Sequence, residues 1–72
     1  MRESDATTLT TAKRLKAIRI KRELTQVEIA DKAKMNANYY AKIERGEVRP
    51  SLDVYERLAK VLKVSSSDLF PF

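Results

Sequence analysis

The side chains of this 72-residue chain that could do chemistry are amides, hydroxyls and cations. The chain contains no Cys and no His, which excludes disulfide bonds, thiol nucleophiles and the usual zinc and imidazole chemistry. Its carboxylates are scattered beside basic neighbours, and it has neither a nucleophile–base set nor a glycine-rich phosphate loop. We therefore expect a binding protein and not an enzyme, with no metal, cofactor or small-molecule ligand.

The cations are concentrated in one short segment. Lys and Arg total 15 against 10 acidic residues, which gives a net charge of +5 and suggests a polyanionic partner. Residues 13–22 (KRLKAIRIKR) hold six of the bases and no acid. On a helix these bases would spread around most of the circumference and would not form one stripe. The segment alone therefore fits a solvated helix face as well as it fits a contact with nucleic acid.

The composition favours one small helical domain. A chain of 8.3 kDa has room for a single core, and one Gly and two Pro are too few for the turns of an all-β fold. No apolar run is long enough to cross a bilayer, and the first ten residues have no apolar signal core. We expect a soluble, cytoplasmic protein.

The first part of the chain predicts an arm followed by a helix. Residues 1–10 are polar and Thr-rich without apolar periodicity, so we expect a flexible arm there and a folded domain over 11–72. A first helix is predicted over about 11–23, with Leu15 and Ile18 facing the core.

Two capping signals predict a pair of short helices. Thr25 with Glu28 three residues later forms a capping box, which places a second helix over about 26–33. Asn36 can cap a third helix over about 37–45. The inward side chains of this pair are expected to be Ile29, Ala30, Ala33, Tyr40 and Ile43.

Gly46 ends the third helix, because a glycine just past a periodic stretch is the usual left-handed stop. Ser51 is expected to cap a fourth helix, and a second capping box at Ser65 and Asp68 opens a last short helical turn. The sequence therefore predicts five helices and no strand. The buried face of the fourth helix is expected to comprise Leu52, Tyr55, Leu58, Ala59 and Leu62.

Two short helices joined by about three residues match the geometry that places a helix in the major groove of DNA. From about residue 12 to residue 70 the chain resembles the phage-repressor type of helix-turn-helix domain, the Cro and xenobiotic-response-element family. The resemblance implies a compact, five-helix, lambda-repressor-like fold. It rests on the motifs Leu24-Thr25-Gln26, Ile29-Ala30, Lys42-Ile43-Glu44-Arg45-Gly46 and Pro50-Ser51-Leu52.

The chain departs from the family at three helix ends. Family members usually carry Gly where this chain has Glu23, Lys34 and Lys63, and a left-handed backbone is common at these positions. A non-glycine residue in that conformation costs roughly 1 kcal/mol. Either the turns differ from those of the family or some stability is given up.

The resemblance implies roles on DNA for two groups of residues. An Asn amide can pair with adenine, a Lys can donate to guanine, and an Ala can contact only a thymine methyl group. On this basis the predicted base-reading residues are Asn36, Ala37, Asn38 and Lys42. The predicted phosphate-binding residues are Arg19, Thr25, Gln26, Tyr39, Arg45 and Arg49.

The resemblance also implies a structural salt bridge and a dimer. The salt bridge would join Arg19 of the first helix to Glu44 of the third. A single helix reads only a few base pairs, so such regulators usually pair and bind an inverted repeat. The possible dimer surface comprises Val54, Val61, Phe70 and Phe72, although Leu69 and Phe70 would serve equally well to close the core.

The predicted function is that of a sequence-specific regulator of transcription, a repressor or autoregulator, that binds double-stranded DNA as a homodimer. It would associate with the nucleoid when bound. The alternative is a protein-interaction module, such as an antitoxin-type domain that binds a partner protein. A steep salt dependence of duplex binding would distinguish the first from the second.

Overall fold

The computed structural model describes residues 3–69, with side chains from Thr8 onward. These residues form four α-helices and one 3-10 turn: α1 (Glu3–Lys21), α2 (Gln26–Lys32), α3 (Ala37–Glu44), α4 (Leu52–Leu62) and η1 (Ser66–Asp68). The all-α class is confirmed and the count of five helices is wrong. The last segment makes hydrogen bonds between residues three apart, which define a 3-10 turn and not an α-helix. Asp68 N donates to Ser65 O, and Leu69 N donates to Ser66 O.

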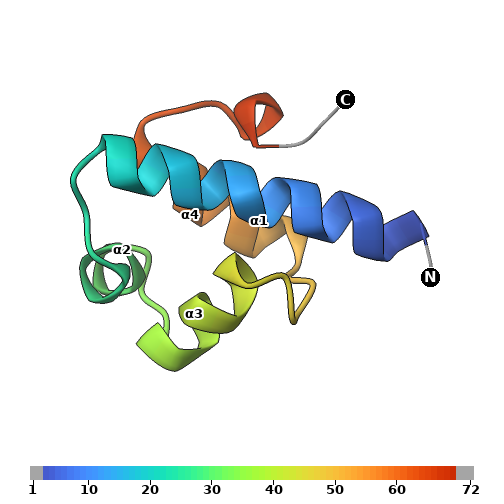
Figure 1. The fold of residues 1–72 in the computed structure, drawn as a ribbon. Coiled ribbons are helices and arrows are strands. Elements are labelled where there is room, and N and C mark those ends of the chain that lie inside the picture. Colours follow the sequence, from blue (N-terminus) through green and yellow to red (C-terminus); the bar gives the residue numbers. More distant parts are fainter. Residues whose placement is uncertain (1–2, 70–72) are drawn as a thin grey trace.

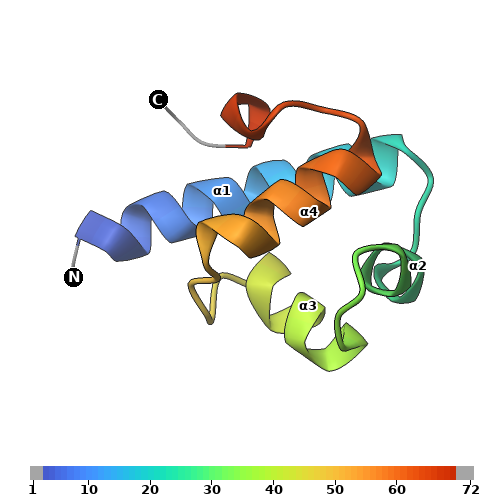
Figure 2. The ribbon, with the colours of Figure 1, turned by 180° about the vertical axis from the view of Figure 1, so that it is seen from behind.

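The helices form two layers. In Figure 1, α1 runs along the upper part of the molecule with α4 behind it, and α2 and α3 lie below. Figure 2 shows the same arrangement from behind, with α4 in front of α1 and α3 again at the lower edge. The two short helices are therefore held on one side of a scaffold made by the two longer ones, and α3 contacts both α2 and α1.

Helix α1 begins at Glu3, so the predicted start near Thr11 is wrong. The early turns of α1 are packed against the rest of the molecule, because the Thr8 side chain is buried and Leu9 lies against the backbone of Gly46. Residues 3–10 are thus helical and not an irregular segment, although they lack apolar periodicity. Their flexibility as an arm separate from residues 11–72 stays a prediction.

The core lies between the layers and contains almost all the residues that the sequence predicts. Leu69 is fully buried and closes the core, while Phe70 lies outside the described residues. Leu52 was expected on the buried face of α4, yet its side chain is 60% exposed. It is the first residue of α4 and precedes Tyr55, where the buried part of that helix starts. The largest fully buried side chains are Tyr40, Leu15, Ile29, Ile43, Leu58, Leu62, Leu69 and Thr11.

The predicted caps are confirmed at three helix starts. Thr25 Oγ1 accepts from Glu28 N at 3.0 Å and Glu28 Oε1 accepts from Thr25 N at 2.8 Å, which completes the capping box of α2. Asn36 caps α3, and Ser51 Oγ accepts from Val54 N at 3.4 Å at the start of α4. Local sequence signals therefore decide where these helices begin.

Three non-glycine residues adopt the left-handed conformation. The φ angles are 59° at Glu23, 60° at Lys34 and 60° at Lys63, and Gly46 has φ of 76°. The turns therefore keep the left-handed geometry that a glycine would adopt without strain. The chain gives up stability at all three helix ends, by roughly 1 kcal/mol each.

Candidate nucleic-acid interface

Helices α2 and α3 cross closely because their inward residues are small. Ala30 and Ala33 are almost fully buried, so the backbones can approach without a bulky side chain between them. The connection is a tight turn in which Lys34 N donates to Asp31 O and Met35 N donates to Ala30 O. This geometry holds α3 at the edge of the molecule with one side uncovered (Figure 1).

The uncovered side of α3 carries the polar residues that the sequence predicts to read bases. Asn36, Asn38 and Lys42 are exposed, and Ala37 is half-buried against the core. Tyr39 is 38% exposed on the same helix, whereas its neighbour Tyr40 is fully buried. The structure therefore brings Asn38, Tyr39 and Lys42 together on one accessible helix surface.

Asn36 has a structural task that limits its use as a base reader. Its Oδ1 accepts from Asn38 N at 2.7 Å and from Tyr39 N at 3.2 Å, which caps α3. A bidentate contact with adenine needs this oxygen as an acceptor. Such a contact at Asn36 would therefore compete with the cap, and only the amide N–H groups are left to donate.

A buried carboxylate joins the three elements around the interface. Glu44 Oε2 accepts from Arg19 Nε at 2.7 Å and from the Tyr40 hydroxyl at 2.5 Å. Glu44 Oε1 accepts from Arg19 Nη2 at 2.9 Å and from Gln26 Nε2 at 3.1 Å. The side chain of Glu44 is 3% exposed and that of Arg19 is 12% exposed. We call Arg19, Gln26, Tyr40 and Glu44 the Glu44 network.

The Glu44 network fixes the charge states of its members. Burial by itself would raise the pKa of Glu44, but hydrogen bonds from Arg19, Tyr40 and Gln26 bring that pKa below its ordinary value. The hydrogen bond to Glu44 raises the pKa of Arg19. Burial, and then the bond to Glu44, raises the pKa of Tyr40. At neutral pH the network therefore consists of a carboxylate, a guanidinium and a neutral phenol.

The tyrosine and glutamine of this network were missed as partners of Glu44. The sequence predicts a core position for Tyr40 and a contact with DNA phosphate for Gln26. The spacing of four residues between Tyr40 and Glu44 could have revealed the first contact, because such residues are neighbours on a helix surface. No local signal could have revealed the second contact, since Gln26 and Glu44 meet only through the crossing of α2 and α3.

We expect acid to destabilise the fold through Glu44. Its folded-state pKa lies below the ordinary value of 4.5, so its contribution to the free energy of unfolding is present above that pH. The contribution is lost as the pH falls through the lowered, folded-state pKa. Urea denaturation from pH 6 down to roughly pH 3 should show this loss. Glu44→Gln should flatten the pH dependence, and an unchanged slope in that variant would contradict the assignment.

The remaining residues predicted to bind phosphate differ in the bonds that their side chains already make within the protein. Arg45 pairs with Glu47, with Nε and Oε2 2.6 Å apart, and both side chains are about half exposed. Thr25 serves as the cap of α2, and Arg49 is exposed in the segment before α4. Arg19 Nη1 also donates to Leu24 O at 2.7 Å. Arg19 is thus tied to the start of the helix-turn-helix by its own hydrogen bonds.

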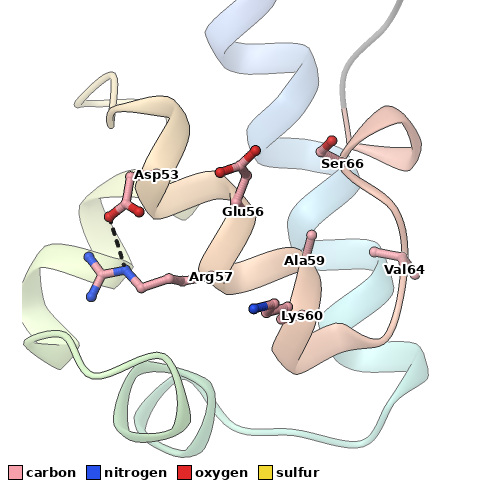
Figure 3. A pocket seen from close by; sticks show the side chains of 7 residues that line it. All are labelled: Asp53, Glu56, Arg57, Ala59, Lys60, Val64 and Ser66. Carbon is pink, nitrogen blue, oxygen red and sulfur yellow. Dashed lines mark ion pairs between the residues drawn. The ribbon is translucent and has the colours of Figure 1, made fainter.

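A shallow pocket of about 410 Å³ lies on α4 and the segment that follows it. Figure 3 shows the Asp53–Arg57 pair on α4 and Val64 and Ser66 on that segment. The pocket is lined by Asp53, Glu56, Arg57, Ala59, Lys60, Val64 and Ser66.

The candidate dimer residues are only partly accessible in the part of the chain that the structure describes. Val54 and Val61 are half-buried against the core. Phe70 and Phe72 lie outside the described residues.

Two crossed short helices, an exposed polar third helix and a buried network beneath them define a helix-turn-helix domain. The model of the helix-turn-helix family matches residues 15–69, and the chain belongs to this family of DNA-binding regulators. The chain is 44% identical over 59 residues to the immunity repressor protein of Bacillus phage phi105. That match covers 82% of the chain and 41% of the repressor, so the chain spans less than half of its relative's length.

Two solved structures share the fold. The restriction-modification controller protein C.AhdI from Aeromonas hydrophila superimposes with a TM-score of 0.87 at 28% identity, over 90% of this chain and 98% of the controller. The clp gene regulator ClgR from Corynebacterium glutamicum superimposes with a TM-score of 0.85 at 21% identity, over 88% of this chain and 67% of ClgR. The second likeness shows the fold alone.

Family membership also bears on the expected absence of catalysis. The helix-turn-helix family is a family of DNA-binding repressors and not of enzymes, which confirms that expectation. Within residues 3–69, no helix is both long and apolar enough to cross a membrane.

Proposed function

We propose that the chain is a sequence-specific repressor or autoregulator that inserts α3 into the major groove of double-stranded DNA. The observation that carries this proposal is the exposed row of Asn38 and Lys42 on a helix that the Glu44 network fixes against α2. The similarity to a phage immunity repressor and to a restriction-modification controller supports it.

In this binding mode base recognition falls mainly on two residues. The Asn38 amide pairs with adenine, and the Lys42 ammonium donates to guanine O6 and N7. Ala37 contacts a thymine methyl group, and Asn36 donates from its amide while its oxygen keeps the cap. Each good pair contributes about 1–3 kcal/mol of discrimination between base pairs.

Phosphate contacts set the register of the domain on the duplex. The start of α2 presents backbone N–H groups beside Gln26, whose second amide hydrogen remains to donate while the first bonds Glu44. Tyr39 contributes its hydroxyl and Arg49 its guanidinium from the two ends of the α3 surface. Arg19, Thr25 and Arg45 complete the set, and Arg45 exchanges Glu47 for a phosphate.

We expect Lys42→Ala and Arg49→Ala to weaken DNA binding in different ways. Lys42→Ala should remove about 1–3 kcal/mol of discrimination for its base pair, because a base contact specifies sequence. Arg49→Ala should weaken binding to every sequence about equally and reduce the salt slope by about one unit. Titrations of both variants on selected and on scrambled duplexes at several salt concentrations would measure this. Equal losses of discrimination in the two variants would contradict the assignment.

The domain is proposed to bind an inverted repeat as a homodimer through α4 and the C-terminal segment. Leu52 supplies an exposed apolar side chain on α4, and Asp53, Glu56 and Lys60 are exposed on the same helix. A two-fold axis places these same residues on both copies, so acidic side chains of one copy can face basic side chains of the other.

We expect two copies of the chain per inverted-repeat duplex. Leu52→Glu should abolish the dimer, because it places like charges about the two-fold axis, while leaving the monomer folded. Sedimentation equilibrium at micromolar concentration, with and without duplex, would measure the mass. A strict monomer under both conditions would contradict the proposed dimer.

A further inference from the structure

An exposed carboxylate lies at the end of the helix that is proposed to enter the major groove. Within residues 36–50 the acidic residues are Glu44 and Glu47. Glu44 is buried in the Glu44 network, whereas the side chain of Glu47 is 51% exposed. Lys42 and Arg45, both proposed to contact DNA, belong to the same segment. A DNA-binding surface gains affinity from its cations, so an exposed acid among them needs an explanation of its own.

The backbone fixes the position of Glu47 on the last turn of α3. Gly46 N donates to Ile43 O at 3.0 Å, and Glu47 N donates to Lys42 O at 2.9 Å. These two bonds define a Schellman motif, in which the residues at the positions of Glu47 and Lys42 are neighbours and are frequently both apolar. Here an acid takes the place of the apolar residue. Its side chain therefore leaves the backbone at a fixed point beside α3.

The carboxylate of Glu47 binds a cation of the same helix end. Glu47 Oε2 accepts from Arg45 Nε at 2.6 Å, and Glu47 Oε1 accepts from Arg45 Nη2 at 3.2 Å. The hydrogen bond from Arg45 lowers the pKa of Glu47 most, and the charges of Arg45 and Lys42 lower that pKa further. At neutral pH the ionised carboxylate therefore covers two guanidinium donors that could bind a phosphate in the same two-point geometry.

Helical geometry places this ion pair on the side of α3 that is proposed to face DNA. The buried side of α3 is the one that carries Tyr40. Lys42 follows Asn38 by four residues and Arg45 follows it by seven, which is nearly two full turns. Asn38, Lys42 and Arg45 thus lie along one exposed stripe. A phosphate that approaches Arg45 on this stripe also meets the carboxylate of Glu47.

We propose that Glu47 is an autoinhibitory residue that competes with DNA phosphate for Arg45. In the free domain its carboxylate holds the guanidinium. In the complex this ion pair opens, and the released carboxylate stays close to the phosphate. Both effects lower the affinity for every duplex about equally, because phosphate contacts carry no sequence information. The inference rests on the proposed function and adds that Glu47 holds the affinity for DNA below the value that the cations alone would give.

The test measures the affinity of Glu47→Gln for DNA. The probe is a fluorescein-labelled duplex of random sequence, about two helical turns long, followed by fluorescence anisotropy at low salt. Glu47→Gln should tighten binding about fivefold, because an exposed ion pair is weak and its removal frees Arg45. The gain should fall to about twofold or less when Arg45→Gln is already present, and it should shrink at high salt.

Asp31→Asn is the matched control. It also removes one exposed carboxylate and changes the net charge by the same amount, but Asp31 lies in the second half of α2, outside the surface proposed to contact DNA. Its affinity for the duplex should stay within about twofold of that of the unaltered chain. Urea denaturation would verify that both variants are folded.

The inference is overturned if Glu47→Gln leaves binding unchanged or weakens it, since a weaker complex would make Glu47 a DNA contact. It is also overturned if Asp31→Asn tightens binding equally, or if the full gain persists without Arg45. Failure of the unaltered chain to bind duplex at all would reject the proposed function, and this inference with it.

Discussion

Glu44→Ala should lower the free energy of unfolding by about 3 kcal/mol or more, because it leaves buried donors without an acceptor. The carboxylate accepts from Arg19, Tyr40 and Gln26, and the Arg19 guanidinium would remain largely buried without its counter-charge. Domains of this size have only about 5 kcal/mol or slightly more in total. Urea denaturation at neutral pH should therefore show a greatly reduced midpoint.

The Glu44 variant has a matched control on the same side of the molecule. Glu47→Ala also removes a carboxylate that pairs with an arginine, but that pair is exposed and should leave the midpoint almost unchanged. Glu44→Gln keeps the shape of the side chain and should lie between the two. A midpoint in Glu44→Ala that equals that of Glu47→Ala would show that the buried network contributes nothing.

The largest expected gain in stability comes from glycine at the three left-handed helix ends. Glu23→Gly, Lys34→Gly and Lys63→Gly each relieve a non-glycine residue with φ near +60°. Each should stabilise the fold by about 0.5–1 kcal/mol, after the entropy that glycine gains in the unfolded chain is subtracted. The sites lie at different helix ends, so the triple variant should gain about 1.5–3 kcal/mol.

The control for the glycine series is the same substitution at a helical position. Lys60→Gly lies inside α4 and should destabilise the fold by about 1 kcal/mol, since glycine there only adds entropy to the unfolded state. Thermal and urea denaturation of all variants would compare the two cases. A loss of stability at Glu23, Lys34 and Lys63 similar to that at Lys60 would rule out backbone strain at the helix ends.

The parts of the fold that depend on local interactions could be predicted from the sequence. Thr25 with Glu28, Asn36 and Ser51 begin their helices as expected, because a cap needs only a side chain and a backbone N–H two or three residues away. The stop at Gly46 depends equally on local geometry. For the same reason Asn38 and Lys42 could be placed on the exposed side of α3.

The parts that depend on tertiary contact could not be predicted. The early turns of α1 have a Thr-rich sequence that favours no element, and they are helical where Leu9 packs against Gly46. The apolar side chain of Leu52 predicts a core position, but Leu52 precedes the part of α4 whose side chains are buried. The role of Gln26 as a partner of Glu44 requires the crossing of α2 and α3. In each case the deciding neighbour lies far away in the chain.

In the proposed binding mode, the cap made by Asn36 would restrict which operator sequences the domain can tell apart. With its oxygen held by the N–H groups of Asn38 and Tyr39, the amide can offer only hydrogens to the groove. Adenine and guanine present N7 there and thymine presents O4, all of them acceptors, so this position would accept any of these three bases and disfavour cytosine, which presents a donor. The half-site would then contain one degenerate position beside the more strictly defined bases proposed to face Asn38 and Lys42.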